Sequence, residues 1–220
     1  MQASQHRAWA GLILLSWLLV PHAHAQAQAN ARAEARNPLK VLVVGDQVSR
    51  AANVHAHLRW TSGLKTMLGR HDETQPVRMI NVSREGATSH RAREQISRLL
   101  RQHNPALVVV QVGAMDQFKG YTQQFTGSNL RSILQRIDAH GARAILVGIT
   151  LPDGVRRPAA DGLQTVYERV AKAARVPLAL IDLATVFSAF DLTTSDLPYI
   201  VRHSQPAVLS STWTALAPIL

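Results

Sequence analysis

A glutamine stands where the sequence leads us to expect a reactive side chain. Residues 41–49 read VLVVGDQVS, so an apolar run closes at Gly45-Asp46 and Gln47 follows at the expected start of a helix. The turn from a strand into a helix is a favourable place to present a side chain to a ligand. A carboxamide is a very poor nucleophile, and it cannot act as a base that removes a proton from another nucleophile. Gln47 is therefore unsuited to nucleophilic or general-base chemistry.

Three further apolar segments end in short stretches that are typical of loops, and two of these stretches contain glycine. NVSREG (81–86) follows the second segment, GAMD (113–116) the third and TLP (150–152) the fourth. Glycines at such positions allow backbone N–H groups to approach a ligand closely. The segment ends are thus the places where a binding or catalytic site is expected.

These ends belong to a regular alternation of apolar and amphipathic segments. Short runs rich in β-branched residues indicate strands, and the segments between them have helical spacing. Continuously apolar strands separated by amphipathic helices predict a parallel sheet covered on both faces, in a three-layer α/β/α domain with five strands. The expected strands are residues 40–44, 77–82, 106–112, 143–149 and 177–181, and the expected helices are about 51–68, 90–103, 123–140, 162–174 and 206–216.

The N-terminal residues have the layout of a secretory signal peptide. Arg7 precedes an apolar run at residues 8–20, and small residues stand at the −3 and −1 positions of a cleavage site after Ala25. Thirteen apolar residues are too few to cross a bilayer. We therefore predict a signal peptide at 1–25, a flexible leader at 26–38 and a single domain at 39–220. The expected location is the periplasm, or outside the cell.

Composition narrows the classes of partner. The chain has no cysteine, so its exported domain must depend on burial without disulfides. The net charge is +10, but the 20 arginines are scattered and lack interleaved aromatic residues, which argues against nucleic-acid binding. Weak binding to anionic envelope surfaces remains consistent with the charge. The histidines have no metal-ligand spacing, and we expect no cofactor and a monomer.

The motifs together resemble one known family. VLVVGD at the first strand, NVSREGATS after the second, VVVQVGAMDQFKG at the third, ITLP at the fourth and VYERVAK in the next helix agree in order and spacing. This chain resembles the SGNH or GDSL-type esterases and lipases, in particular the bacterial periplasmic acyl-thioesterase and lysophospholipase branch. The resemblance covers about residues 39–170 and fades after 183. It implies a flavodoxin-like SGNH-hydrolase fold and acyl-transfer chemistry.

The resemblance also assigns a role to five positions. In the family a serine after Gly-Asp attacks the ester, a histidine three residues after an aspartate is the base, and a glycine N–H and an asparagine stabilise the oxyanion. The corresponding residues here are Gln47 (nucleophile position), Gly86 (oxyanion N–H), Met115 (oxyanion asparagine position), Ile200 (aspartate position) and His203 (base).

The departures from the family pattern predict a degenerate active site. Loss of one oxyanion donor alone costs on the order of 10²–10³ in rate, and here the nucleophile and the orienting carboxylate are replaced as well. The first hypothesis is therefore a catalytically inactive binding or scaffold protein that takes an acyl or glycan ligand in the remnant cleft. Asp46 and Asp116 are interpreted as acceptors that brace loops, and turn or capping roles are expected for the nearby hydroxyl residues Ser83, Thr88 and Ser89.

Two alternatives remain open from the sequence. An active esterase or acyl-thioesterase would need a rearranged nucleophile, for which Ser49 with His203 is the best pair, although Ser49 is also suited to cap a helix. A binder of anionic envelope components would depend on the basic charge alone and would release its ligand as salt rises.

Overall fold

The computed structural model describes residues 37–150, 162–183 and 197–220, and in α9 it describes side chains from Val201 onward. The predicted signal peptide, nearly all of the leader and the segment after Thr150 lie outside these ranges. Within them, no helix combines the length and the apolar character needed to cross a bilayer.

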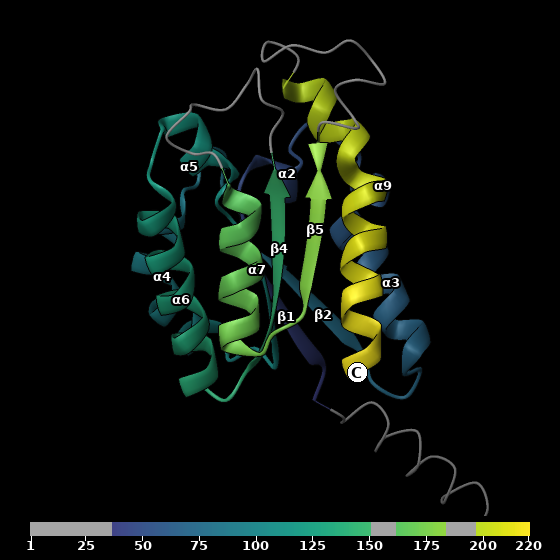
Figure 1. Ribbon diagram of the computed structural model, residues 1–220. Helices are drawn as coiled ribbons and strands as arrows, with labels where there is room; N and C mark the ends of the chain where they lie inside the picture. Colours follow the sequence, from purple (N-terminus) through teal and green to yellow (C-terminus); the bar gives the residue numbers. More distant parts are fainter. Residues whose placement is uncertain (1–36, 151–161, 184–196) are drawn as a thin grey trace, which may run out of the picture.

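Five parallel strands form one sheet, as predicted (Figure 1). The strands lie side by side in the order β2-β1-β3-β4-β5, which is the flavodoxin-like order. Their bounds agree with the predicted segments to within two residues: β1 Leu39–Gly45, β2 Val77–Asn81, β3 Leu107–Gln111, β4 Arg143–Thr150 and β5 Leu178–Asp182.

Helices cover both faces of the sheet and complete the predicted three layers (Figure 1). One face carries the short α2 (Gln47–Arg50), α3 (Trp60–His71) and α9 (Leu197–Leu216). The other carries α4 (Ser89–His103), α6 (Gln123–Ala139) and α7 (Leu163–Ala174). The remaining elements are α5 (Ala114–Lys119) and the 3-10 turns η1 (Ala56–Leu58) and η4 (Ala217–Ile219).

The central strands are apolar throughout because both of their faces are buried. In β1, Val41 and Val43 pack towards α3 and α9, whereas Leu42 and Val44 pack towards α4 and α6. This period of two is the pleat of a strand, and it explains the unbroken apolar runs in the sequence.

The predicted helix at 51–68 is wrong in its first half. Ala51 ends α2 with a left-handed backbone, φ 44°, and α3 begins only at Trp60. The Arg59 side chain donates from Nε to the Val54 carbonyl across the intervening turn at 2.9 Å. Apolar spacing alone did not reveal this interruption, since Val54 within it is buried just as Leu64 of α3 is.

The C-terminal helix is longer than the predicted 206–216. It begins at Leu197 and contains Pro206, whose missing N–H removes one helical hydrogen bond. The ring of Pro206 is exposed, while Val201 and Val208 are buried against the sheet. Burial on both sides of the proline holds the helix together, so the proline did not mark its start.

Candidate active site

The three positions that follow β1, β2 and β3 lie together at one edge of the sheet. Gln47 opens α2 directly after β1, Gly86 lies in the turn after β2, and Met115 is in the first turn of α5 after β3. Because β1 lies between β2 and β3, the carboxyl ends of all three strands meet at this edge. Ligand sites of open parallel sheets form where the strand order reverses, which here is around β1.

The Gln47 carboxamide bridges the two positions to which the resemblance assigns oxyanion stabilisation. Its Oε1 accepts a hydrogen bond from the Gly86 N–H at 3.3 Å, and its Nε2 donates to Met115 Sδ at 2.9 Å. All three residues are partly exposed, so the bridge lies at the surface of the site. The Gly86 N–H therefore already has an acceptor within the chain.

Glycine is required at the end of β3 to place Met115. Gly113 has φ 125°, a backbone conformation that side-chain-bearing residues rarely adopt. The Tyr167 hydroxyl lies where a Cβ of residue 113 would stand, and it donates to the Val112 carbonyl at 3.0 Å. This packing fixes the chain between β3 and α5. The helix α5 was not among the helices predicted from the sequence.

Asp116 braces the turn that carries Met115, as expected. Its buried carboxylate accepts from the Ser89 N–H at 2.9 Å, from the Ser89 hydroxyl and from the Thr126 hydroxyl at 2.8 Å. Asn129 adds a hydrogen bond to Ser89 Oγ at 3.0 Å. The first turns of α4, α5 and α6 are thereby connected, and Asp116 has a structural role.

The other hydroxyl residues near this edge also have local roles. Thr88 is the N-cap of α4 and accepts from the Arg91 N–H at 3.3 Å. The Ser83 N–H donates to Asn81 Oδ1 at 3.1 Å, which is a turn contact. The capping role predicted for Thr88 is confirmed, whereas the Ser83 hydroxyl has no hydrogen-bond partner among the described residues.

Ser49 lies inside the protein beneath the site. It is within α2, has no exposed surface, and donates from Oγ to Gln111 Oε1 at 2.6 Å. The suggested capping role of Ser49 is wrong, because Asp46 is the N-cap and accepts from the Val48 N–H. Gly45 leaves room for this arrangement, since a Cβ there would lie 2.6 Å from Ser49 Cβ.

Positions 200 and 203 both belong to α9, which begins at Leu197 and so lies partly before the predicted helix at 206–216. His203 is partly buried in the second turn of this helix, and the side chain of Ile200 lies outside the described part of the structure. Gln205 ties α9 to α2 and α3, since its Nε2 donates to the Val48 carbonyl at 3.1 Å and its Oε1 accepts from the Trp60 N–H at 3.0 Å. His203 is thus carried by the helix that packs on α2.

Two buried glutamines were not recognised as part of this region from the sequence. Gln111 accepts from the Ser49 hydroxyl and from the Asp46 N–H, and Gln205 links α9 to α2. The signal for Gln111 was available, since a polar residue interrupts the apolar run of β3 at its last position. Among the described residues, no group of three or more His, Asp or Glu side chains is arranged to hold a metal ion.

Asp46 is a buried acid at this edge of the sheet. Its carboxyl group is fully buried; Oδ1 accepts from the Val48 N–H at 2.9 Å, and Oδ2 has no hydrogen-bond partner among the described residues. Desolvation by burial raises the pKa of Asp46 to about 7, and the hydrogen bond from Val48 opposes only part of this rise. Near neutral pH this group is therefore divided between its two protonation states.

Fold and motif positions define the class of protein. Residues 43–200 match the model of the GDSL-like Lipase/Acylhydrolase family, and the chain belongs to this family. The chain is 31% identical to Esterase TesA of Pseudomonas aeruginosa over 82% of this chain and 89% of the relative. It is 29% identical to Thioesterase 1/protease 1/lysophospholipase L1 of Escherichia coli strain K12, over 82% of this chain and 84% of that protein.

Solved structures agree with the family assignment. The crystal structure of TesA superposes with a TM-score of 0.72 at 30% sequence identity, covering 82% of this chain and 99% of that one. The psychrotrophic esterase EstA from Pseudoalteromonas sp. has a TM-score of 0.67 at 20% identity, covering 82% and 97%. The second likeness shows the fold alone, and both support the SGNH-hydrolase architecture.

The pKa of Asp46 generates a prediction about stability. A shift from 3.8 to about 7 corresponds to on the order of 4 kcal/mol. Below about pH 4 the group is protonated in both the folded and the unfolded chain; between about pH 4 and 7 only the unfolded chain ionises. The free energy of unfolding should therefore fall as pH rises through this window, with the loss complete above it.

Asp46→Asn removes this titration while keeping an oxygen that can accept from the Val48 N–H. Urea denaturation of both proteins at about pH 5 and about pH 8 should show the variant gaining stability relative to wild type at the higher pH. Other titrating groups cancel in this difference. An equal difference between the two proteins at both pH values would contradict the assignment.

Proposed function

We propose that this chain is an exported SGNH-family protein that has lost hydrolase chemistry and acts as a binding or scaffold protein in the bacterial envelope. The observation that carries the proposal is the hydrogen bond from the Gly86 N–H to the Gln47 carboxamide at 3.3 Å. A donor needed for a developing oxyanion is engaged by the residue that stands at the nucleophile position. Catalysis by the family route has neither an attacking oxygen nor a free oxyanion site here.

The remaining roles do not compensate for this loss. Met115 offers a thioether, which donates no hydrogen bond, and the position of the orienting carboxylate is Ile200. Oxyanion stabilisation is usually the largest single contribution to such reactions, so losing it together with the nucleophile leaves little acceleration. The role we propose is therefore the binding of an acyl or glycan ligand at this edge of the sheet without turnover.

The relatives named above favour the alternative proposal, in which the chain is an active hydrolase. Proteins at about 30% identity are described as an esterase and a thioesterase, so ester or thioester hydrolysis is the reaction this family membership favours. The rearranged pair of Ser49 and His203 is the route left open by the sequence. The burial of Ser49 and its hydrogen bond to Gln111 argue against that route, because a nucleophile must reach the substrate.

Hydrolysis of short-chain p-nitrophenyl esters and acyl-thioesters tests the proposal. We expect the purified protein, Gln47→Ala and Ser49→Ala all to give rates indistinguishable from buffer, with the esterase of Pseudomonas aeruginosa as the positive control. Gln47→Ala is the matched control for Ser49→Ala, since both are short truncations within α2. Turnover by wild type that is abolished in Ser49→Ala but kept in Gln47→Ala would establish the rearranged esterase instead.

Rebuilding the family residues gives a second test. Gln47→Ser alone frees the Gly86 N–H but supplies no oriented base, so this single variant should remain inactive. Adding Met115→Asn and Ile200→Asp restores a donor and places a carboxylate three residues before His203, on the same face of α9.

The rebuilt triple variant should hydrolyse p-nitrophenyl esters measurably faster than the single variant, and circular dichroism checks that both are folded. Activity in Gln47→Ser alone would show that His203 acts without an orienting carboxylate. Equal inactivity of two folded variants would contradict the expected recovery of activity.

A further inference from the structure

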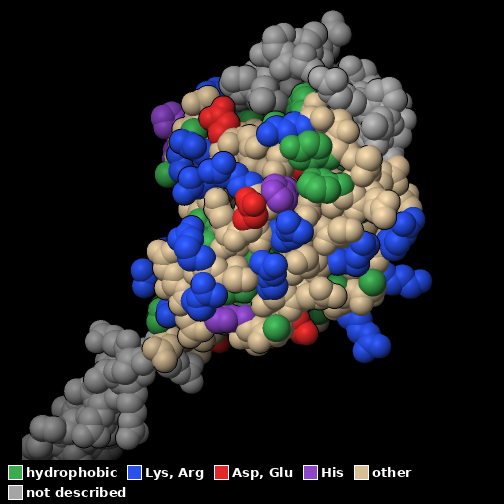
Figure 2. Space-filling view, turned by 90° about the vertical axis from the view of Figure 1, so that its left-hand side faces the viewer, with side chains coloured by type: hydrophobic (Ala, Val, Ile, Leu, Met, Phe, Trp, Pro, Cys, Tyr) green, Lys and Arg blue, Asp and Glu red, His purple; other side chains and the backbone are tan. Residues whose placement is uncertain are grey.

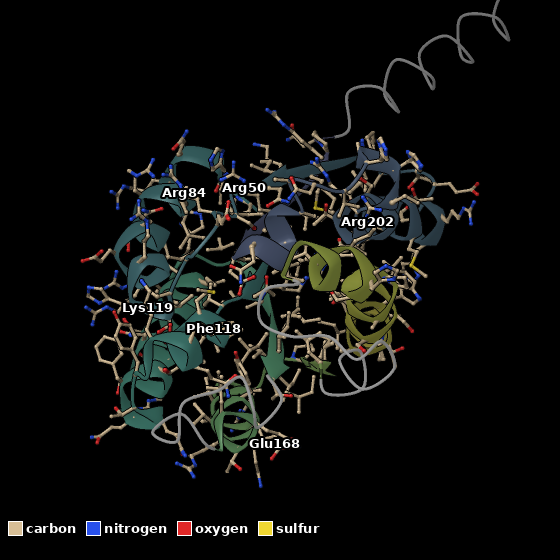
Figure 3. All side chains as sticks on the ribbon, turned by 90° about the horizontal axis from the view of Figure 1, so that it is seen from above. Arg50, Arg84, Phe118, Lys119, Glu168 and Arg202 are labelled. Atoms are coloured by element: carbon tan, nitrogen blue, oxygen red, sulfur yellow. The ribbon has the colours of Figure 1, made fainter. Side chains whose placement is uncertain are left out.

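A second recess lies beside the Gln47 site and shares Gly86 with it. Its volume is about 340 Å³, and it is lined by Arg50, Arg84, Glu85, Gly86 and Arg91. These residues come from the end of α2, the turn after β2 and the first turn of α4. Figure 3 shows Arg50 and Arg84 next to each other at this end of the molecule, with Arg202 of α9 farther away. We call this recess the arginine pocket.

The arginine pocket carries a positive charge that the protein does not neutralise. Three arginines and one glutamate line it, and none of the three arginines forms an ion pair in the described part of the chain. Glu94 of α4 instead contacts His90, whose Nε2 lies 3.2 Å from Glu94 Oε1. Figure 2 shows that basic side chains far outnumber acidic ones on the face formed by α4 and α6.

The position of Arg91 adds to this charge at an energetic cost. The first turn of a helix has a positive partial charge from its aligned peptide dipoles, and α4 extends over 15 residues. A cation there is unfavourable, and the first turn of α4 contains no acidic residue that would offset this cost. Like charges held together in a recess favour the binding of an anion.

We propose that the arginine pocket binds the dianionic phosphoryl group of a ligand. A guanidinium presents two parallel N–H donors that match two phosphate oxygens, and three such groups opposed by one carboxylate suit a doubly charged group. The volume is at the lower end for small-molecule sites, which suits a phosphate monoester or a lipid headgroup. The inference rests on the proposed function in one respect, the assignment of a binding role to this edge of the sheet.

Calorimetric titration of the purified protein with inorganic phosphate at low ionic strength tests the pocket. The double variant Arg84→Gln with Arg91→Gln should weaken binding by about tenfold or more, because two charge-assisted contacts are lost. The matched control is Arg70→Gln with Arg101→Gln, which removes the same charge from exposed positions in the last turns of α3 and α4. The control should bind phosphate as wild type does.

Sedimentation with lipid vesicles distinguishes a lipid headgroup from a soluble phosphate ester as the source of the phosphoryl group. Retention on phosphatidic acid vesicles but not on phosphatidylcholine vesicles, lost in the pocket variant and competed by phosphate, identifies a lipid headgroup. Phosphate binding without vesicle retention identifies a soluble phosphate ester.

Two results would overturn the proposal: no saturable phosphate binding by wild type, or equal weakening in both double variants, which would mean that net charge alone attracts the anion. The phosphate titration contains no ester, so a lack of phosphate binding would not contradict the proposed loss of hydrolysis. Detection of ester hydrolysis, in turn, would not contradict phosphate binding in the arginine pocket.

Discussion

The Gln47 carboxamide and its two hydrogen bonds are the constraint on which the functional account depends. Its oxygen accepts from the Gly86 N–H, and its nitrogen donates to Met115 Sδ, so one side chain joins the ends of β1, β2 and β3. In an active site of this architecture the same space would receive a substrate carbonyl and its developing charge. Here the Gln47 oxygen already accepts from the Gly86 N–H, so an ester carbonyl would have to compete with a neutral acceptor of the chain itself.

Buried polar groups in the surrounding structure hold the turns that make these hydrogen bonds with Gln47. Gln111 holds the hydroxyl of Ser49, Asp116 connects the first turns of three helices, and Gln205 fastens α9 to α2. Such groups are costly to bury unless they are hydrogen-bonded, so their pairing fixes the turns around Gln47 in one geometry. The recess formed by Arg50, Arg84 and Arg91 lies just outside this network, where the side chains remain exposed and charged.

Much of the architecture was predictable because the strands have a simple physical signature. Segments such as VLVV and LVVVQ are buried on both faces, and their ends meet at one edge, which brought Gln47, Gly86 and Met115 together as expected. The break at Ala51 and the continuation of α9 through Pro206 were not predictable, because tertiary packing overrode the local pattern there. The bridge made by Gln47 depends on a side-chain conformation and on the turn at Gly86, which composition and spacing do not encode.

Intact-mass spectrometry after incubation with a fluorophosphonate tests the central claim most directly, because this reagent phosphonylates an activated serine without requiring turnover. The account predicts an unchanged mass for this protein under conditions in which the esterase of Pseudomonas aeruginosa gains one phosphonyl group. A stoichiometric adduct on this chain, mapped by peptide sequencing to Ser49 or to any other serine, would contradict the account and show that a nucleophile operates at this site.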